Sequence, residues 1–263
     1  MDLDLKNKTA LVAASSSGIG KAIAKSLAQE GVDVCLLARD EGKLKFAQED
    51  ILKVAKGKVV YTVCDLASKD QIDNAYEFAK KELGEIDILV NNQGGPKPGE
   101  FDTLSEDDIE SSLNINLKSV LRLTRLCLPS MQKRKYGRIL NVLSISAKEP
   151  LKGMFLSNTV RPAVLGFAKS LATQYAESNI TVNSLLPSSV MTERTRFLVG
   201  NKAEADGTSY EQALAECVSS FPSKHIAEEK EISSVAAFLC SPLASYINGV
   251  ALAVDGSFSK SIL

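Results

Sequence analysis

The sequence predicts an α/β protein with a mostly parallel sheet that is covered by helices on both faces. Short apolar, β-branched runs alternate with longer amphipathic segments, which is the order produced by right-handed βαβ crossovers. The short runs are almost continuously apolar, as expected for strands buried on both faces. Because the 263 residues contain no repeat, low-complexity tract or linker, residues 1–263 are expected to form a single domain.

The strands are expected where valine, isoleucine, leucine and alanine gather in short runs. In chain order they are Thr9–Ala13, Val32–Ala38, Val59–Val63, Ile86–Val90, Arg138–Val142, Thr181–Leu186 and Val250–Val254. About seven strands are therefore expected in one sheet.

The helices are expected in the amphipathic segments between these strands. In order they are Gly18–Gln29, Glu41–Ala55, Lys69–Leu83, a long helix running from Ser105 towards Met131, Asn158–Ala176 and Glu228–Leu239. Ser105 and Asp108 have the spacing of a capping box, which predicts the start of the long helix.

One irregular stretch, Met191–Ala227, has no clean strand pattern and follows the carboxyl end of a strand. Loops of this length are usually functional or disordered, so residues 191–227 are predicted to form a substrate lid. An ordinary surface excursion is the alternative.

Composition excludes several classes of function. The formal net charge is -1, from 31 basic and 32 acidic residues, which gives no electrostatic reason to expect nucleic acid or an anionic membrane as a partner. No apolar run is long enough to cross a bilayer, and a cytoplasmic protein is expected. The 5 cysteines are scattered and the chain has 1 histidine, so reduced thiols and no metal site are expected.

The segment after the first strand predicts a phosphate-binding loop. Glycines there let the backbone approach a pyrophosphate, and the helix that follows supplies N–H donors and a favourable dipole. The residues expected to bind the cofactor are Ala14, Ser15, Ser17, Gly18, Ile19 and Gly20. Together with the strand order, this loop indicates a Rossmann-type doubly wound sheet. Ala14 stands at the first glycine position of a GxxxGxG pattern, and we expect its φ to stay negative.

The end of the second strand favours NADP over NAD. NAD sites usually place an acidic residue there for the ribose 2′-hydroxyl, whereas this chain has Ala38 followed by Arg39. An arginine can pair with a 2′-phosphate. The alternative is a solvated arginine that is neutralised by Asp40, with NAD as the cofactor.

Further motifs follow in order along nearly the whole chain. They are Asp65-Leu66 after the third strand, Asn91-Asn92-Gln93-Gly94 after the fourth, Asn116 in the long helix, Ser144 after the fifth strand, Pro187 and Thr192 after the sixth, and Val254-Asp255-Gly256 at the end. With the glycine loop, this series resembles the short-chain dehydrogenases/reductases, and in particular 3-oxoacyl-carrier-protein reductase-like members.

The resemblance implies a fold, an activity and a set of site residues. It implies hydride transfer between a nicotinamide cofactor and a small carbonyl or alcohol substrate, in a dimer or tetramer. The positions implied to bind the cofactor, beyond the glycine loop and Arg39, are Asp65, Leu66, Asn91, Asn92, Gly94, Arg161, Pro187, Val190 and Thr192. The positions implied to act in catalysis are Asn116, Ser144, Ser157 and Arg161.

Two of these catalytic positions depart from the family pattern. The family has a tyrosine and a lysine four residues apart on the helix after the fifth strand, where this chain has Ser157 and Arg161. A serine hydroxyl is a much weaker acid than a phenol, and its shorter side chain does not reach as far. Arg161 can hold ribose hydroxyls, but it activates no phenol.

Three interpretations follow from this departure. The first is a reductase or dehydrogenase with an altered proton donor, such as a water held by Ser144 and Ser157, or Lys148 or Lys152 from the following loop. The second is a nucleotide-binding protein with little redox turnover, acting as a sensor or as a subunit of a mixed oligomer. The third is a different reaction at the same site. The sequence does not identify the substrate.

Overall fold

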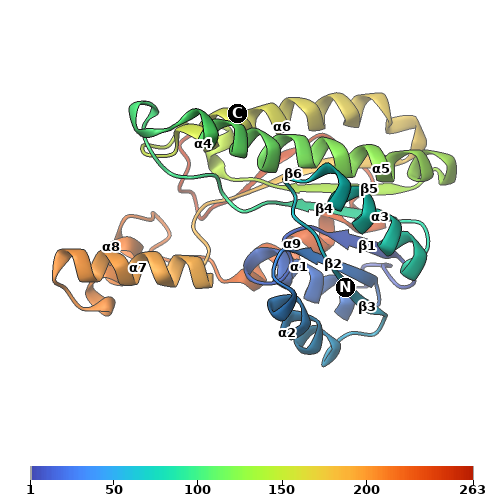
Figure 1. Ribbon diagram of the computed structural model, residues 1–263, viewed down its shortest axis with the longest axis horizontal. Coiled ribbons are helices and arrows are strands. Elements are labelled where there is room, and N and C mark those ends of the chain that lie inside the picture. Colours follow the sequence, from blue (N-terminus) through green and yellow to red (C-terminus); the bar gives the residue numbers. More distant parts are fainter. Residues whose placement is uncertain (1, 263) are drawn as a thin grey trace.

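The computed structural model describes residues 2–262, which form a seven-stranded parallel sheet between two layers of helices (Figure 1). The strands are β1 (Thr9–Val12), β2 (Asp33–Ala38), β3 (Val59–Val63), β4 (Ile88–Asn92), β5 (Gly137–Val142), β6 (Ile180–Pro187) and β7 (Ala251–Val254). The helices are α1 (Gly18–Gln29), α2 (Glu41–Leu52), α3 (Lys69–Leu83), α4 (Glu106–Ser112), α5 (Ser119–Arg134), α6 (Phe155–Gln174), α7 (Glu193–Asp206), α8 (Tyr210–Ser219) and α9 (Glu229–Leu239). The predicted fold class is confirmed.

The order of strands in the sheet places the site. It runs β3-β2-β1-β4-β5-β6-β7, so the chain winds outward from β1 to β3 and then returns to continue outward on the other side from β4. The direction reverses between β1 and β4. In sheets of this kind the crevice for a ligand lies at the carboxyl ends of the strands that flank this reversal.

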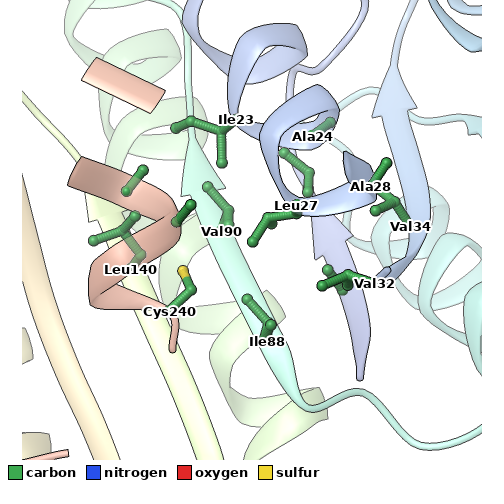
Figure 2. Close-up of a cluster of buried hydrophobic side chains, with 14 of the residues drawn as sticks. Ile23, Ala24, Leu27, Ala28, Val32, Val34, Ile88, Val90, Leu140 and Cys240 are labelled. Atoms are coloured by element: carbon green, nitrogen blue, oxygen red, sulfur yellow. The ribbon is translucent and has the colours of Figure 1, made fainter. Parts of the chain in front are cut away.

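The core lies on both faces of the sheet because neighbouring residues of each buried strand point to opposite sides. In β1, Ala10 and Val12 pack with α1, α2 and α9, whereas Leu11 and Ala13 pack on the opposite face with residues of α3, α5 and α6. Figure 2 shows the first of these clusters, in which Leu27 lies close to the strands. Burying a leucine or isoleucine side chain contributes roughly 1.5–3 kcal/mol, so these two clusters hold the sheet and fix the strand ends.

The predicted capping box at Ser105 and Asp108 is confirmed, but the single long helix predicted after it is wrong. Helix α4 ends at Ser112, and a π-helical turn, Leu113–Lys118, connects it to α5. The wider turn carries Asn116, whose Nδ2 donates to the carbonyl oxygen of Gly94 at 2.7 Å. Such turns interrupt helices where a side chain must be redirected, often at functional sites.

Two other boundaries differ because side chains make contacts that the pattern does not reveal. Helix α6 begins at Phe155, three residues before the expected Asn158, because the Asn158 side chain bonds both backbone groups of Leu151. Strand β4 lies two residues further along than expected. It extends to Asn92 because Asn91 pairs with Asn141 on β5.

The stretch expected to be irregular is mostly helical. Helices α7 and α8 form a hairpin that projects from the body of the molecule (Figure 1). They share a small core of Val199, Ala203 and Ala213, and Gly207 ends α7 with a φ of 63°. Within residues 2–262, no helix has the length and apolar character needed to cross a membrane.

Candidate active site

A cleft with a volume of about 1050 Å³ opens at the carboxyl ends of β1 and β4, where the winding direction reverses. The predicted site residues that line it are Ala14, Ser17, Gly18, Ile19, Arg39, Asp65, Leu66, Asn92, Gly94, Asn116, Arg161 and Thr192. Residues from Ala14 to Thr192, far apart in the sequence, therefore meet at one edge of the sheet, as the order of the motifs predicts.

The phosphate loop is held closely against β4. Asn92 Nδ2 donates to the carbonyl oxygens of Ala13 and Ala14, at 3.3 and 3.2 Å. Gly20 lies beneath this contact, and a β-carbon built there would lie 2.4 Å from Ala14 O and 2.6 Å from Asn92 Nδ2. Glycine at position 20 is therefore a steric requirement of the loop. The first N–H groups of α1 are left facing the cleft, where they suit a diphosphate.

The expected negative φ at Ala14 is wrong. Ala14 has a φ of 46°, in the left-handed region that glycine adopts at no steric cost. The physical reason is the turn that the loop makes above Gly20, in which the carbonyl of Ala14 faces Asn92. A left-handed alanine costs roughly 1–2 kcal/mol, which the surrounding contacts offset.

Two cations stand at the end of the cleft nearest β2. Arg39 follows this strand, and Lys43 lies in the first turn of α2; both line the cleft. The alternative in which Asp40 neutralises Arg39 is not supported, because Asp40 accepts the Lys43 backbone N–H at 2.9 Å and forms no ion pair with Arg39 in the described chain. An unneutralised pair of cations suits a 2′-phosphate.

Behind the opposite end of the cleft, hydrogen bonds connect three serines to the buried Arg161, which lines the cleft. Arg161 Nε donates to Ser157 Oγ at 2.9 Å, and Ser157 Oγ lies 2.8 Å from Ser146 Oγ. The backbone N–H of Ser146 in turn donates to Ser144 Oγ at 3.2 Å. Ser146 therefore links both serines that the sequence singled out, although it was not itself predicted.

A second guanidinium group reaches the same end of the cleft. Arg194, in the first turn of α7, lines the cleft with Arg161. Burial and, to a smaller extent, the charge of Arg194 together lower the pKa of Arg161 to about 10. Arg161 is still a cation at neutral pH.

Some predicted site residues lie behind the cleft and do not line it. Ser15 bonds Val12 O and the Leu37 N–H, and Asn91 bonds Asn141; both side chains are fully buried. Five further predicted residues do not line the cleft either: Ser144, which is half-buried, and Gly20, Ser157, Pro187 and Val190, which are buried. Side-chain contact between Asn91 and a ligand in the cleft is therefore excluded in this conformation.

Three residues that matter at this site were missed by the sequence reasoning. Lys43 could have been found from its place one turn after Arg39, and Arg194 from its place two residues after Thr192. Ser146 has no pattern that distinguishes it from its neighbours. Within residues 2–262, no group of three or more His, Cys, Asp or Glu side chains could hold a metal ion.

Comparison with known proteins decides the family. The model of the short chain dehydrogenase family matches residues 8–202. This chain belongs to the short-chain dehydrogenase family. It is 30% identical over 259 residues to an NADPH-dependent reductase, BacG, of Bacillus subtilis, with 98% of this chain and 100% of that protein covered. It is 33% identical over 255 residues to the oxidoreductase UcpA of Escherichia coli, covering 96% and 94% of the two chains.

Solved structures of other short-chain dehydrogenases have the same fold. L-Sorbose reductase from Gluconobacter frateurii, solved with NADPH and L-sorbose, gives a TM-score of 0.96 at 30% identity and covers 100% of both chains. An actinorhodin polyketide ketoreductase solved with NADPH gives 0.90 at 28% identity and covers 97% of this chain and 98% of its own. The cofactor named in these relatives agrees with the prediction of NADP over NAD.

Proposed function

We propose that this protein is an NADP(H)-dependent oxidoreductase that interconverts a carbonyl and an alcohol in a small molecule. The observation that carries the proposal is the cleft itself. It has a glycine-dependent phosphate loop, two unneutralised cations at one end, and the Asn116 amide with two guanidinium groups at the other.

The residues present fit NADP. The N–H groups at the start of α1 would hold the diphosphate, and Arg39 with Lys43 would hold the 2′-phosphate. Thr192 stands opposite Gly18, where a β-carbon built on the glycine would lie 3.5 Å from Thr192 Cγ2. It would close the cleft over the diphosphate and the nicotinamide.

The chemistry supplied by the bound cofactor is hydride transfer. The chain must then place the carbonyl and supply or remove a proton. Ser144 would hold the carbonyl oxygen together with a water molecule. Arg161 fixes Ser157 by its 2.9 Å hydrogen bond, and Ser157 fixes Ser146. The water would be the proton donor, because the side chains of Lys148 and Lys152 are exposed and make no hydrogen bond to these serines in the described chain.

A second candidate function is nucleotide binding with little turnover, in a sensor or in a subunit of a mixed oligomer. It is favoured by one observation: no tyrosine lines the cleft within the described residues. General acid catalysis typically contributes 10²–10⁴-fold, so the absence of a phenol is a large loss unless water replaces it.

Titration calorimetry with NADPH and NADH, followed by NADPH oxidation against a panel of carbonyl compounds, tests both candidates. Tight NADPH binding with measurable oxidation supports the reductase. Binding without oxidation across the panel supports the second candidate. No heat with either nucleotide refutes both.

The missing acid can be tested directly with the double variant Ser157→Tyr/Arg161→Lys. If proton donation limits the parent, this variant should raise the rate of NADPH oxidation about 100-fold or more. The matched control is Ser157→Phe/Arg161→Lys, which has the same ring without the hydroxyl and should remain slow. Equal rates of NADPH oxidation in the two variants would contradict the idea that the parent protein lacks an efficient proton donor.

We further propose a homo-oligomer, a dimer or tetramer, in the cytoplasm. Tyr246, Leu243 and Leu252 expose apolar surface near the edge strand β7, which a second copy could cover. The 5 cysteines are all free, which suits a reducing compartment. Light scattering on the purified protein tests the oligomer.

We also propose that the hairpin of α7 and α8 acts as the substrate lid, with Arg194 at its base.

A further inference from the structure

Two guanidinium groups converge on one point at the substrate end of the cleft. A β-carbon built on Gly95 would lie 3.5 Å from Arg194 Nη1 and 4.0 Å from Arg161 Nη2, so both nitrogens lie within 4.0 Å of the same point. The two arginines come from different elements, α6 and the first turn of α7. Like charges this close repel each other unless an anion lies between them.

No protein anion occupies this position among residues 2–262. Neither Arg161 nor Arg194 forms a salt bridge with a carboxylate there. Asp108, an acidic residue that also lines the cleft, is paired with Lys97 at 2.7 Å. Arg161 is 7% exposed, and its one described hydrogen bond is made through Nε, which leaves its Nη donors free for a ligand.

The position of this charge relative to the hydroxyl groups indicates the class of substrate. Arg161 is bonded directly to Ser157, which is linked through Ser146 to Ser144. An anion held by the Nη groups of Arg161 would therefore lie beside the carbonyl that Ser144 holds. A carboxylate matches two guanidinium groups because each of its oxygens accepts charge-assisted hydrogen bonds.

We propose that the substrate is a 2-oxo or 3-oxo carboxylic acid, or the corresponding hydroxy acid, whose carboxylate is bound between Arg161 and Arg194. This inference rests on the proposed function and specifies its substrate. The diphosphate of the cofactor is the competing anion, and the N–H groups at the start of α1 provide for it separately. The ribose hydroxyls that Arg161 is expected to hold are uncharged, so they do not neutralise the two guanidinium groups.

Binding is measured by calorimetry on the protein saturated with NADP⁺, in which an oxo acid cannot be reduced. The probes are acetoacetate against acetoacetamide, and 2-oxobutanoate against 2-oxobutanamide, pairs that differ in charge and hardly in shape. At least one acid should bind about 10- to 100-fold more tightly than its amide, the range expected for hydrogen bonds to a charged group. Equal affinities in both pairs, or no binding of either acid, would overturn the proposal.

Two variants on the same helix distinguish binding at this site from a general effect of the protein's net charge. Arg194→Gln should weaken acid binding about tenfold. The matched control is Arg196→Gln, which removes the same charge two residues away from a side chain that does not line the cleft, and should leave acid affinity unchanged within about twofold. If Arg194→Gln weakens NADP⁺ by the same factor as the acid, the diphosphate is the occupant and the proposal fails.

A stability measurement tests the same site without any ligand. Gly95→Asp would place a carboxylate between the two arginines, whereas Gly95→Asn adds an uncharged side chain of the same shape. The aspartate variant should have a Tm at least about 2 °C above the asparagine variant and should lose acid binding. An equal Tm would overturn the proposal. If the unmodified protein does not bind NADP⁺ at all, the proposed function is refuted instead.

Discussion

Gly20→Ala is the sharpest perturbation of the phosphate loop. The added β-carbon would lie 2.4 Å from the carbonyl oxygen of Ala14, about 0.6 Å inside the 3.0 Å that such contacts essentially never undercut. It would also lie 2.6 Å from Asn92 Nδ2, the group that holds the loop on β4. The oxygen of Ala14 belongs to the main chain and cannot rotate away as a side-chain end can, so the backbone of the loop must move.

The expected cost follows from this geometry. Overpacking of this kind typically costs about 1–3 kcal/mol of folding free energy. Moving the loop by about 0.6 Å also misaligns the N–H groups at the start of α1, and loss of one or two hydrogen bonds to a charged diphosphate corresponds to roughly 100-fold weaker binding. The NADPH Kd should therefore rise about 100-fold, with the fold retained.

Calorimetric titration with NADPH measures the Kd, and urea unfolding measures the stability. The control is Gly166→Ala, on the exposed part of α6, where an added β-carbon meets no atom within 4 Å. It should leave NADPH binding unchanged and raise stability by roughly 0.5–1 kcal/mol, since alanine is the better helix former. If Gly20→Ala binds NADPH within threefold of the parent, the cleft does not bind the cofactor through this loop.

Three further predictions concern the cofactor cation, the strained alanine and a surface ion cluster. Arg39→Ala should weaken NADPH about 10- to 100-fold by calorimetry and leave NADH within about threefold; an equal effect on both would remove the basis for NADP. Ala14→Gly should keep NADPH binding and raise the free energy of unfolding by up to about 1 kcal/mol, because the left-handed φ of 46° suits glycine; a clear loss would contradict the strain argument. Hydrogen bonds to Lys21 and Lys25 lower the pKa of Asp50 to about 2, so the stability that this carboxylate provides is complete above its unfolded pKa of about 4 and is lost as the pH falls through about 2. Asp50→Asn should therefore cost about 1 kcal/mol at pH 7, after allowance for solvent screening, and less at pH 3 in urea unfolding; a cost that does not change with pH would refute this cause.

The elements that the sequence located well are those whose residues make mainly local or purely apolar contacts. Helices α1 and α3 have the expected bounds, because residues close together in the sequence determine where each helix starts, which face is apolar and where it ends. Strand β3 was also located correctly. The long helix after Ser105 was not, because its π-helical turn depends on Asn116 bonding Gly94 from another part of the chain.

The same division holds within the site. The phosphate loop and Arg39 could be found in the sequence because a strand end and a helix start imply where a diphosphate lies. The φ of Ala14 could not be found, because it is set by a contact with Asn92, which comes 78 residues later in the chain. Arg194 belongs to a stretch that has no periodic pattern as a sequence, although it folds into helices.

The sequence by itself determined the doubly wound sheet, and it predicted the position of the cofactor loop and the presence of Ser157 and Arg161 where the family has a tyrosine and a lysine. These follow from the order and spacing of residue types along one chain. The tertiary structure decided what surrounds these two residues: Ser146 joins Ser144 to Ser157, and Arg194 brings a second cation to Arg161. Ser146 lies 11 residues from Ser157, and Arg194 lies on another helix than Arg161, so only the folded chain brings these groups together.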